Sequence, residues 1–576
     1  MEDTAGIKSL TVMNRRRFLL VSTATAGAAL LAACGGSSND NTATSSAGTA
    51  ASESTSASSG SASPSSGGSS SGATPEASAA ASAASTAAAG VPGGKKIYRI
   101  GTPSAITELD PGHTTTEVNN APQEALFDYV ARYTYDPPLG NAIVPDLAKS
   151  WDLSSDGTTF TFHLQTGVKF HNGDEMTADD IKWNFDRYQN PDTGSSAGPD
   201  WKGATITVVD PSTVEVKFDH PNVAFIPATI AYSCKIISPK VSQQLGDKWI
   251  TGPVGTGPFT WGEYLSGTSL KLNQNADYWG TKPKIDQIEF HMSVDDRTAS
   301  LAISKGEIDA YYIADPNIAI TASKANDANV VFKKAQYGIS PFNVWFNMKR
   351  KPLDDVRVRH ALRYAIDSES IAKDLFGGLA QVIDCYIPAF MRGYTDDVTK
   401  FEFDPDKAKS LLKEANVPSD WAPEMISQSI LVISKQITEA IASMWSDIGI
   451  KIKNSSLEQG IITKRRAAVD YDMYATYVTR IDPSQLTSRF WRSDGSSNLS
   501  NYSGADDIID KIDAEPDPDK QAQLYMELQK KLADDSPASW SVAVSEHMLL
   551  NKRVQGEQGA GWLERFNWFD VDVPAE

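Results

Sequence analysis

Residues 152–173 read DLSSDGTTFTFHLQTGVKFHNG, and this stretch sets the expectation for the fold. Its middle part, residues 158–164, alternates β-favouring side chains with a period of two, which is typical of a strand with one buried face. Asn172-Gly173 then indicates a tight turn, because this pair readily adopts positive φ. The stretch therefore predicts a strand followed by a turn.

A helix is expected directly after this turn. Thr177 suits the N-cap position, and the acidic residues Asp179 and Asp180 suit the first helical turn. Two more strands are predicted at residues 205–209 and 213–218. Strands and helices then alternate in groups, which indicates an α/β or α+β body. Later amphipathic helices are predicted after Asp354, after Pro405, and over residues 437–445 and 521–532.

The stretch at residues 152–173, with the helix start at residues 177–181, resembles the signature of extracellular solute-binding proteins of family 5. These proteins are the receptors of peptide/nickel-type ABC importers. The likeness extends over residues 97–576, because further family motifs follow in the expected order. They are Val254-Gly255-Thr256-Gly257-Pro258-Phe259, Asn275-Ala276-Asp277-Tyr278-Trp279, Gly306-Glu307-Ile308-Asp309, residues 352–362 and Asp482-Pro483.

The resemblance implies an α/β fold, a two-lobed periplasmic-binding-protein-like clamp (type II, cluster C) with an extra domain. Such a clamp closes over its ligand about a hinge and is expected to act as a monomer. The length of the chain after residue 94 also exceeds the usual size of a single core. Lobe I is expected at residues 97–138, 246–347 and 536–576, the extra domain at 139–245, and lobe II at 348–535.

Residues 1–33 resemble an export signal. The basic start at Arg15-Arg16 resembles a twin-arginine signal, and an uncharged apolar run continues to Ala33. Leu31-Ala32-Ala33-Cys34 resembles a bacterial lipobox, which implies cleavage before Cys34 and lipid attachment to its sulfur. An ordinary export signal and an uncleaved N-terminal anchor are the alternatives.

Residues 34–94 are interpreted as a tether. Residues 35–94 contain no aromatic side chain and only three charges, so they bury too little apolar surface to offset the entropy cost of folding. At about 5–6 Å times the square root of the residue number, such a tether reaches roughly 40–45 Å. The folded body is therefore expected at the outer face of the cell membrane, attached to it only through the lipid.

The charge of the chain restricts its partners. The formal net charge is −19, and because residues 1–33 carry +2, the remainder carries −21. Such an acidic surface argues against nucleic acid as a partner and against electrostatic docking on anionic lipid. The resemblance implies other partners, namely a small-molecule or short-peptide ligand and the permease and ATPase subunits of an ABC importer.

The resemblance also implies a ligand site near Asp482-Pro483. In peptide receptors of family 5, an Asp four residues before the proline holds the α-amine of the ligand, but here the corresponding residue is Thr479. A peptide and another small organic molecule therefore both remain possible ligands. Arg480 is a candidate to bind a carboxylate or phosphate of the ligand, and a structural arginine is the alternative. Asp482 belongs to the same candidate site.

Aromatic residues are further candidates, because flat ring faces suit stacking on ligand ring systems. They are Trp345, Tyr477 and Trp491, and a place in the core is the alternative for each. On the opposite wall, the resemblance implies that a loop faces the ligand. The loop residues are Thr114, Thr115, Thr116 and Glu117.

No cofactor, metal or catalytic residue is predicted. The sequence contains no GxSxG, HExxH or P-loop motif, and its seven His form no close-spaced pair that would suit nickel. The segment Gly255–Pro258 is interpreted as a rigid crossing point near the hinge. Asp354 and Asp355 are interpreted as helix caps, with Arg357 and Arg359 in structural ion pairs. Cys234 and Cys385 either form a disulfide after export or remain two buried thiols.

The sequence therefore predicts a substrate-binding lipoprotein of an ABC importer and not an enzyme. The solute would stabilise the closed clamp through its higher affinity for that state, and the closed clamp would deliver it to a permease. A receptor that passes its ligand to a signalling partner is the alternative, and an exported hydrolase is a further one.

Overall fold

The structure is a computed structural model, and it describes the chain from residue 94 onward. The expected signal peptide, Cys34 and nearly all of the tether lie outside the described residues. All of the described residues belong to one compact unit. The described residues are 94–113, 117–133, 143–195, 197–246, 248–313, 315–334, 340–429, 432–478, 482–544, 547–556 and 568–576.

Seven strands form the sheet of lobe I, in the order β12-β19-β11-β1-β10-β9-β8. β1 runs parallel to both of its neighbours, and the other pairs are antiparallel. The sequence predicted β1, and its alternating side chains bury Tyr98 and Ile100. The strands are β1 (Ile97–Gly101), β8 (Phe259–Leu265), β9 (Ser269–Gln274), β10 (Gln287–His291), β11 (Ala310–Ile313), β12 (Val330–Lys334) and β19 (His547–Asn551).

Helices cover lobe I on both sides of its sheet. On one side, α6 (Asp296–Lys305) and α7 (Pro316–Lys324) pack over Tyr311 of β11. On the other side, α2 (Glu117–Leu126) packs in the cluster that contains Tyr98 and Ala310. Because consecutive residues of a strand point to opposite faces, Ala310 and Tyr311 enter different cores.

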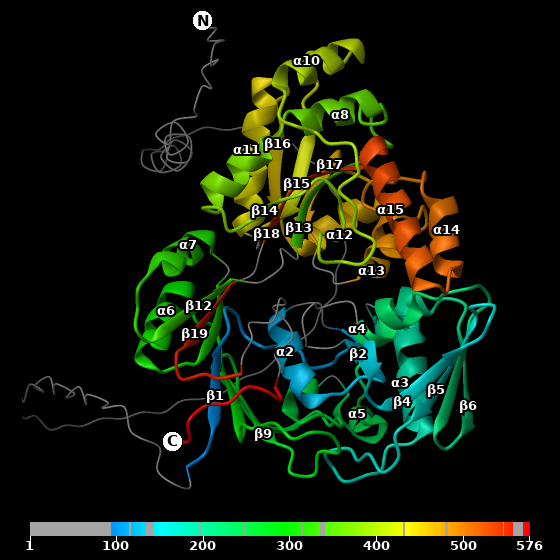
Figure 1. Cartoon of the computed structure of the whole chain (residues 1–576), viewed down its shortest axis with the longest axis vertical. Coiled ribbons are helices and arrows are strands. Elements are labelled where there is room, and N and C mark those ends of the chain that lie inside the picture. Colours follow the sequence, from blue (N-terminus) through cyan, green and yellow to red (C-terminus); the bar gives the residue numbers. More distant parts are fainter. Residues whose placement is uncertain are drawn as a thin grey trace, which may run out of the picture. The chain divides into compact units, whose positions relative to one another are not determined.

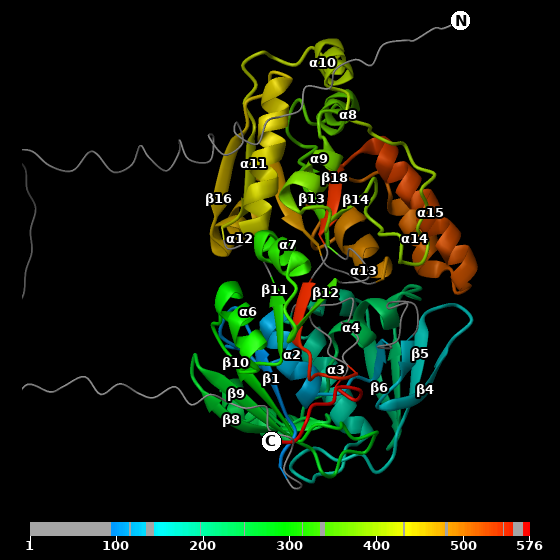
Figure 2. The same cartoon turned by 60° about the vertical axis from the view of Figure 1, so that its left-hand side comes forward.

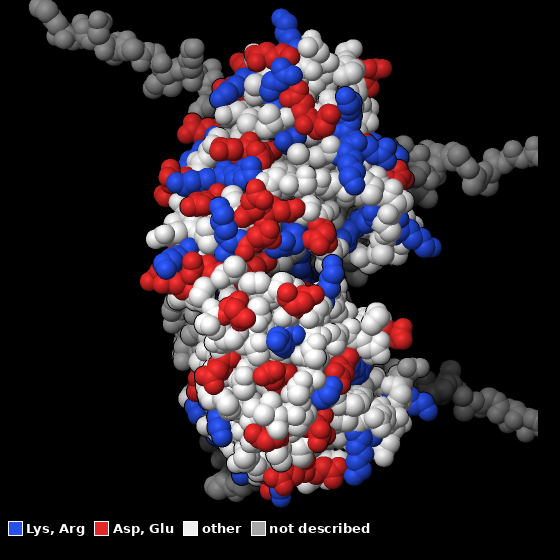
Figure 3. All heavy atoms as spheres, turned by 90° about the vertical axis from the view of Figure 1, so that its right-hand side faces the viewer, with Lys and Arg blue, Asp and Glu red and all other residues white. Residues whose placement is uncertain are grey.

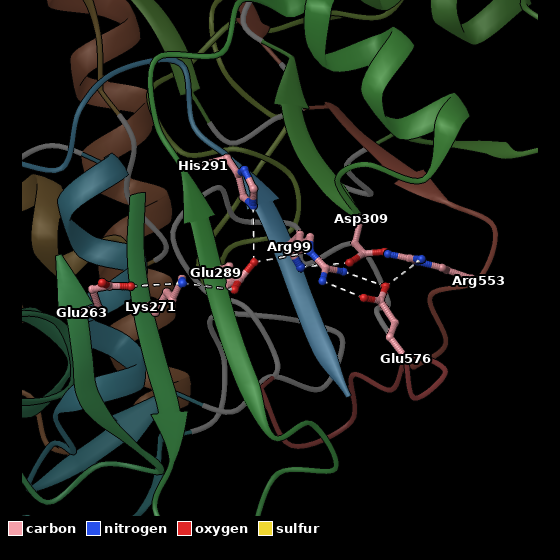
Figure 4. A network of polar contacts seen from close by, with 8 residues as sticks. All are labelled: Arg99, Glu263, Lys271, Glu289, His291, Asp309, Arg553 and Glu576. Carbon is pink, nitrogen blue, oxygen red and sulfur yellow. Dashed lines mark hydrogen bonds and ion pairs between the residues drawn. The ribbon is translucent and has the colours of Figure 1, made fainter. Parts of the chain in front are cut away.

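A network of charged residues crosses the polar face of this sheet (Figure 4). Arg99 of β1 donates from Nη1 and Nη2 to the two carboxylate oxygens of Glu576, each at 2.7 Å. Arg553 donates to Asp309 at 2.6 Å and lies 3.2 Å from Glu576. The Arg99 guanidinium holds the pKa of Glu576 below its usual value. The charges of this face are thus neutralised within the fold, which indicates a structural role.

Six strands form the sheet of lobe II, in the order β14-β18-β13-β17-β15-β16 (Figures 1 and 2). Both faces of this sheet are covered, so every residue of β13 is buried. Its alternation sends Val344 into one core and Trp345 into the other. The strands are β13 (Ser340–Phe346), β14 (Gln381–Val382), β15 (Glu424–Gln428), β16 (Lys453–Leu457), β17 (Met473–Tyr477) and β18 (Ala538–Val544).

The predicted helices of lobe II are confirmed, and they lie on opposite faces of its sheet. Residues of α8 (Val356–Tyr364), α10 (Pro405–Glu414) and α11 (Val432–Asp447) pack in the core that contains Val344. Residues of α14 (Asp506–Ala514) and α15 (Pro518–Asp535) pack in the core that contains Trp345.

Basic residues of α8 cap the C-terminus of α15. Arg359 donates to the carbonyl oxygens of Asp535 and Ser536, and Arg363 donates to that of Ala533. These carbonyls lack partners inside the helix, and the cations also complement the helix dipole. Arg359 therefore binds backbone carbonyl groups, whereas the sequence analysis predicted a structural ion pair for it. Asp355 caps α8 and pairs with Arg357 at 2.6 Å, as the sequence predicted.

A four-stranded antiparallel sheet, β4-β5-β7-β6, forms a separate inserted domain with its own core. β5 is the predicted strand of the opening stretch, and it buries Phe160 and Phe162 against α3 (Ala178–Gln189). α3 begins after Thr177 as predicted, and Asp180 accepts the backbone N–H of Thr177 at 2.9 Å. The strands are β4 (Ala148–Leu153), β5 (Thr159–Leu164), β6 (Thr205–Asp210) and β7 (Thr213–Lys217).

Shorter elements complete the fold. β2 (Ala131–Tyr133) and β3 (Ile143–Pro145) form a two-stranded sheet. The remaining α-helices are α4 (Ala231–Ser233), α5 (Pro239–Leu245), α9 (Ser368–Ser370), α12 (Gln459–Ala467) and α13 (Ser484–Leu486). The 3₁₀ turns are η1 (Pro191–Thr193), η2 (Gly198–Trp201) and η4 (Trp249–Thr251). The π-helical turns are η3 (Ile226–Ile230), η5 (Ile371–Leu375) and η6 (Thr487–Trp491).

The sheets divide the chain differently from the sequence-based boundaries at 347 and 536. β13 and β18 pair with each other inside the sheet of lobe II, although the sequence-based division placed both in lobe I. The chain therefore passes from one sheet to the other between Lys334 and Ser340, and again between Val544 and His547. A strand belongs to the sheet in which it is hydrogen-bonded, and no local pattern in β13 or β18 reveals that partner.

Candidate functional site

The region between the lobes begins at two adjacent crossings. β12 pairs with β19 in lobe I, and β13 pairs with β18 in lobe II. Lys334 and His547 form the final pair on the lobe I side, and Ser340 and Val544 form the first pair on the lobe II side. The buried core clusters of the two lobes share no residue, although the partly buried Leu379 packs against one cluster of each lobe. Two separately packed bodies joined by short segments can move as rigid units.

The inserted domain meets lobe II again through a buried ion pair. Arg489 of η6 donates from Nε to Oδ1 of Asp200 in η2 at 3.0 Å, and its Nη2 donates to Oδ2. The two side chains are 18% and 14% exposed. Burial opposes the charge of Arg489, but the Asp200 carboxylate outweighs that effect and raises the arginine pKa. This pair joins elements that lie 289 residues apart in the sequence.

Further hydrogen bonds join the inserted domain to lobe II. The carbonyl oxygen of Pro227 in η3 accepts the Tyr133 hydroxyl at 2.6 Å and Nε2 of Gln485 in α13 at 3.2 Å. The backbone N–H of Val223 donates to the carbonyl of Asp513 at 3.0 Å. Both cartoon views place the inserted domain beside α13 and α14 and away from β18 and β19 (Figures 1 and 2).

The predicted loop on the opposite wall is only partly described. Thr114, Thr115 and Thr116 lie outside the described residues, as do Thr479 and Arg480. Glu117 begins α2, so the loop leads directly into the N-terminus of that helix. A ligand role for these residues therefore stays a prediction.

Asp482 is buried, and its carboxylate is used inside the protein. Its Oδ1 accepts the backbone N–H of Ser484 at 2.9 Å and the Ser484 hydroxyl at 2.5 Å. Burial raises the pKa of Asp482, while Arg392 and the Ser484 contacts oppose the increase. These contacts shape the start of α13. The structure thus gives Asp482 a capping role in the turn that precedes α13.

Trp345 and Trp491 come together, but inside the core of lobe II. Their rings stack with centroids 4.7 Å apart at 28°, and each is 1% exposed. Phe490 stacks on Trp345 at 5.5 Å, and Trp540 meets Trp491 edge-on at 5.9 Å. The ring faces predicted to stack on a ligand are therefore used by neighbouring rings. The cause is the alternation of β13, which directs Trp345 toward α15 and η6.

Tyr477 is the most accessible of the three predicted aromatic residues. It ends β17, pairs with Phe342 of β13, and is half-buried against the core of lobe II. Residues 479–481 follow it directly, and they lie outside the described residues. Tyr477 therefore stays the candidate nearest to the predicted Thr479 and Arg480.

The segment Gly255–Pro258 proves to be a packing junction between α2 and the inserted domain. A Cβ at Gly255 or Gly257 would lie 2.3 Å or 2.5 Å from backbone atoms of Leu126. His171 accepts the Gly255 N–H at 3.3 Å and donates to the Gly257 carbonyl at 3.0 Å. Burial lowers the pKa of His171 to about 4, so its ring is neutral at pH 7. The glycines allow close backbone approach.

The described residues contain no group of three or more His, Cys, Asp or Glu that could hold a metal ion. Cys234 and Cys385 are both buried and free, so the disulfide alternative is absent from the structure. Burial raises the pKa of both thiols, which keeps them protonated. Among the described helices, none is both long and apolar enough to cross a membrane.

Charges of both signs are intermixed on the face shown in Figure 3. Lys and Arg side chains alternate with Asp and Glu side chains, most densely over lobe II in the upper half of the view. This face has no cationic stripe that would track a phosphate backbone.

Sequence reasoning missed the residues of the ion-paired junction. Arg489 lies in the mostly uncharged segment Thr487–Trp491, and a cation in such a segment is a signal that it needs a buried partner. Nothing in the local sequence identifies Asp200 as that partner. Gln485, Pro227 and Tyr133 carry no motif at all.

Known proteins resemble this chain over most of its length. The profile of bacterial extracellular solute-binding proteins, family 5 Middle, matches residues 142–498, which is more than half of the chain. The dipeptide-binding protein of Escherichia coli (strain K12) is 29% identical over 448 residues, covering 72% of this chain and 83% of the relative. Heme-binding protein A of Haemophilus influenzae is 26% identical over 428 residues, which cover 69% of this chain and 78% of the relative.

Solved structures share the fold. The periplasmic binding protein DppA from Helicobacter pylori, in complex with the peptide STSA, matches with a TM-score of 0.73 at 23% identity, covering 83% of this chain and 99% of that chain. AgaA from A. tumefacien R10, in complex with agropinic acid, matches with a TM-score of 0.72 at 22% identity, with the same coverage. The predicted α/β periplasmic-binding-protein fold is thereby confirmed.

The family match also decides the class of activity. Solute-binding proteins of this family bind and carry out no reaction, which confirms the prediction that the chain is not an enzyme. The matched residues include the opening stretch at 152–173 and the motif at Asp482-Pro483. The chain belongs to the bacterial extracellular solute-binding proteins of family 5.

Proposed function

We propose that this chain is the lipid-anchored receptor of an ABC importer, and that it captures a peptide or another small organic solute between lobes I and II. The observation that carries the proposal is the presence of two separately packed lobes that are joined by two adjacent crossings. A solute that contacts both lobes stabilises the closed arrangement through differential affinity. The closed form then docks on the permease.

The proposed solute contacts lie on the residues next to the Asp-Pro motif and on the opposite loop. Arg480 would bind a carboxylate of the solute, and Thr479 stands where peptide receptors of the family carry an acidic amine anchor. Relatives bear names that refer to dipeptides and heme, and similar structures hold the peptide STSA and agropinic acid. We propose a carboxylate-bearing small solute, with short peptides as the first class to test.

Binding is tested in two steps. Protein purified under gentle conditions is denatured, and mass spectrometry identifies any molecule that is released. Calorimetry on solute-stripped protein then measures binding of dialanine, the peptide STSA, heme and agropinic acid. Saturable one-to-one binding of a released molecule or of one of these probes is expected. If no molecule is released and none of these probes binds, solute capture is contradicted.

The anchor is tested separately in the native host. The Cys34→Ala variant should move from the membrane fraction to the soluble exported fraction, because the lipid is the proposed attachment. Replacement of Arg15 and Arg16 by Lys should block export if the signal is of the twin-arginine type. Retention of Cys34→Ala on the membrane would refute the lipid anchor.

Import and signalling are separated by deletion of the gene. Loss of solute uptake after deletion would show import, and unchanged uptake would favour signalling alone.

A further inference from the structure

The junction between the inserted domain and lobe II has the properties of a conformational contact. No chain crossing occurs there, since the inserted domain is contiguous with lobe I through β2, β3 and the Gly255–Pro258 segment. Its strongest contact is the bidentate pair of Arg489 and Asp200, both largely buried. Such a contact exists only while the inserted domain and lobe II are together.

The chemistry of the pair makes it sensitive to closure. A planar guanidinium that forks onto a carboxylate is satisfied in one geometry only, so separation by a few ångströms loses both hydrogen bonds. In an open clamp each charge would be hydrated separately. In the closed clamp each charge loses water, and only the partner offsets that loss. Removing one partner therefore disfavours the closed state, because it leaves the other charge buried and alone.

The same junction is connected to the candidate solute site. Gln485 donates to the Pro227 carbonyl of the inserted domain, and its Oε1 accepts the backbone N–H of Asp482 at 3.4 Å. Asp482 directly follows residues 479–481, where solute contact is proposed. η3 and η6, which carry Pro227 and Arg489, are both π-helical, a geometry that is frequent at functional sites. The junction thus contacts the residue that directly follows the proposed solute contacts in the sequence.

We propose that Arg489 and Asp200 form a closure latch, a pair of positioning residues that favours the closed clamp without touching the solute. This inference rests on the proposed function, capture by closure. Through the latch, the inserted domain contributes to closure from the side of the molecule that lies away from β18 and β19 (Figures 1 and 2). Because the pair is buried, salt screens it less than the exposed ion pairs of the surface.

Closure is measured at a second ion pair of the same junction. Lys202 and Asp494 lie 4.0 Å apart, and their side chains are 85% and 66% exposed, so their replacement removes little energy. Both are replaced by Cys in the full chain, together with Cys34→Ser. Cys234 and Cys385 are buried and do not compete for reagent. The rate of cross-linking by a short bis-maleimide then reports how often the junction closes.

Arg489→Gln and Asp200→Asn are each expected to lower this rate about tenfold or more, in the range seen for close buried charge pairs. The double variant should be no slower than either single variant, because both remove the same contact. Arg465→Gln is the matched control: Arg465 pairs with Glu424 at 2.8 Å with similar burial, but within lobe II. It should lower the melting temperature and leave the cross-linking rate unchanged.

Folded Arg489→Gln protein that cross-links at the unaltered rate would overturn the latch. If neither Arg489→Gln nor Asp200→Asn yields folded protein, the pair serves folding and not closure, which also overturns it. The rate is measured without solute, so it decides the latch even if no solute binds. In a second arm with dialanine, the latch predicts about tenfold weaker binding by Arg489→Gln. Failure of dialanine to bind the unaltered protein would speak only against the choice of peptide as solute.

Discussion

His547 pairs with Lys334 across the β12–β19 ladder, and this pair is the last of lobe I before both crossings to lobe II. The His547 ring is 6% exposed and lies 5.3 Å from the ring of Phe332. Burial, and to a lesser degree the charge of Lys334, lowers the pKa of His547 to about 4. The lobe I side of the hinge therefore holds a neutral imidazole at pH 7.

Acid should weaken the fold through this residue. An unfolded His titrates near pH 6.5, so the unfolded chain binds the proton first as the pH falls. The contribution of neutral His547 is complete above about pH 6.5 and is lost progressively down to about pH 4. The full loss is on the order of 3 kcal/mol. Guanidinium unfolding between pH 7.5 and 4.5 measures the free energy of unfolding over this window.

The variant His547→Gln separates this residue from the rest of the protein. It cannot titrate, so its free energy of unfolding should fall less steeply over the same pH window. His171, whose pKa is also lowered to about 4 by burial, remains in the variant and keeps part of the slope. Identical slopes for the variant and the unaltered protein would show that His547 is not buried as a neutral ring.

Arg363 should be far more important for stability than Arg357, although both lie on α8. Arg363 is 3% exposed and donates to the carbonyls of Ala533 and Asp384. Arg363→Met would leave the Asp384 carbonyl without a donor among the described residues and the Ala533 carbonyl with the Ser536 hydroxyl alone, at a cost of about 2–4 kcal/mol in the free energy of unfolding. Arg357→Met removes an exposed pair with Asp355 and should cost much less, because water screens that pair. Guanidinium unfolding compares them, and equal effects would contradict the capping role.

Gly257 tests the packing junction between α2 and the inserted domain. Gly257→Ala would place Cβ 2.5 Å from a backbone carbon of Leu126, so the backbone must move. The expected loss is about 3 kcal/mol, at the upper end of overpacking costs. Gly460 is the matched control, because nothing lies within 4 Å of its added Cβ. Gly460→Ala should be neutral or stabilise by up to about 1 kcal/mol. Thermal melting compares the stability of the two variants, and equal melting temperatures would contradict the close packing at Gly257.

Trp491 should behave as a core residue. Trp491→Ala removes a ring that is 1% exposed and should cost about 3–5 kcal/mol in the free energy of unfolding. Phe403→Ala, at a position that is 50% exposed, should cost less than about 1 kcal/mol. If Trp491→Ala left stability intact but abolished binding of a solute identified by mass spectrometry, the ring would be a ligand contact after all.

Local patterns in the sequence predicted the parts of the fold that depend on local physics. The alternation at residues 158–164 gave β5, and Thr177 with Asp180 gave the start of α3. The spacing of apolar residues likewise located α8, α10, α11 and α15. Each of these features depends on residues a few positions apart.

Contacts between distant segments could not be predicted in this way. β13 was assigned to the wrong lobe because its partner β18 begins almost 200 residues later. Trp345 was a candidate for ligand stacking because the sequence does not show which face of β13 is buried against α15. The latch residues Asp200 and Arg489 are joined only by tertiary structure. The family motifs located the Asp-Pro turn, but they do not show that Asp482 caps it.

Small-angle scattering tests closure of the clamp most directly, because it measures the radius of gyration of the protein in solution. Protein purified with its bound solute is compared with the same protein after the solute has been removed by unfolding and refolding, and again after the solute is returned. We expect the radius of gyration to increase when the solute is removed and to decrease again when it is restored, because the solute favours the closed arrangement. Identical scattering in all three states, with binding shown by calorimetry, would contradict capture by closure.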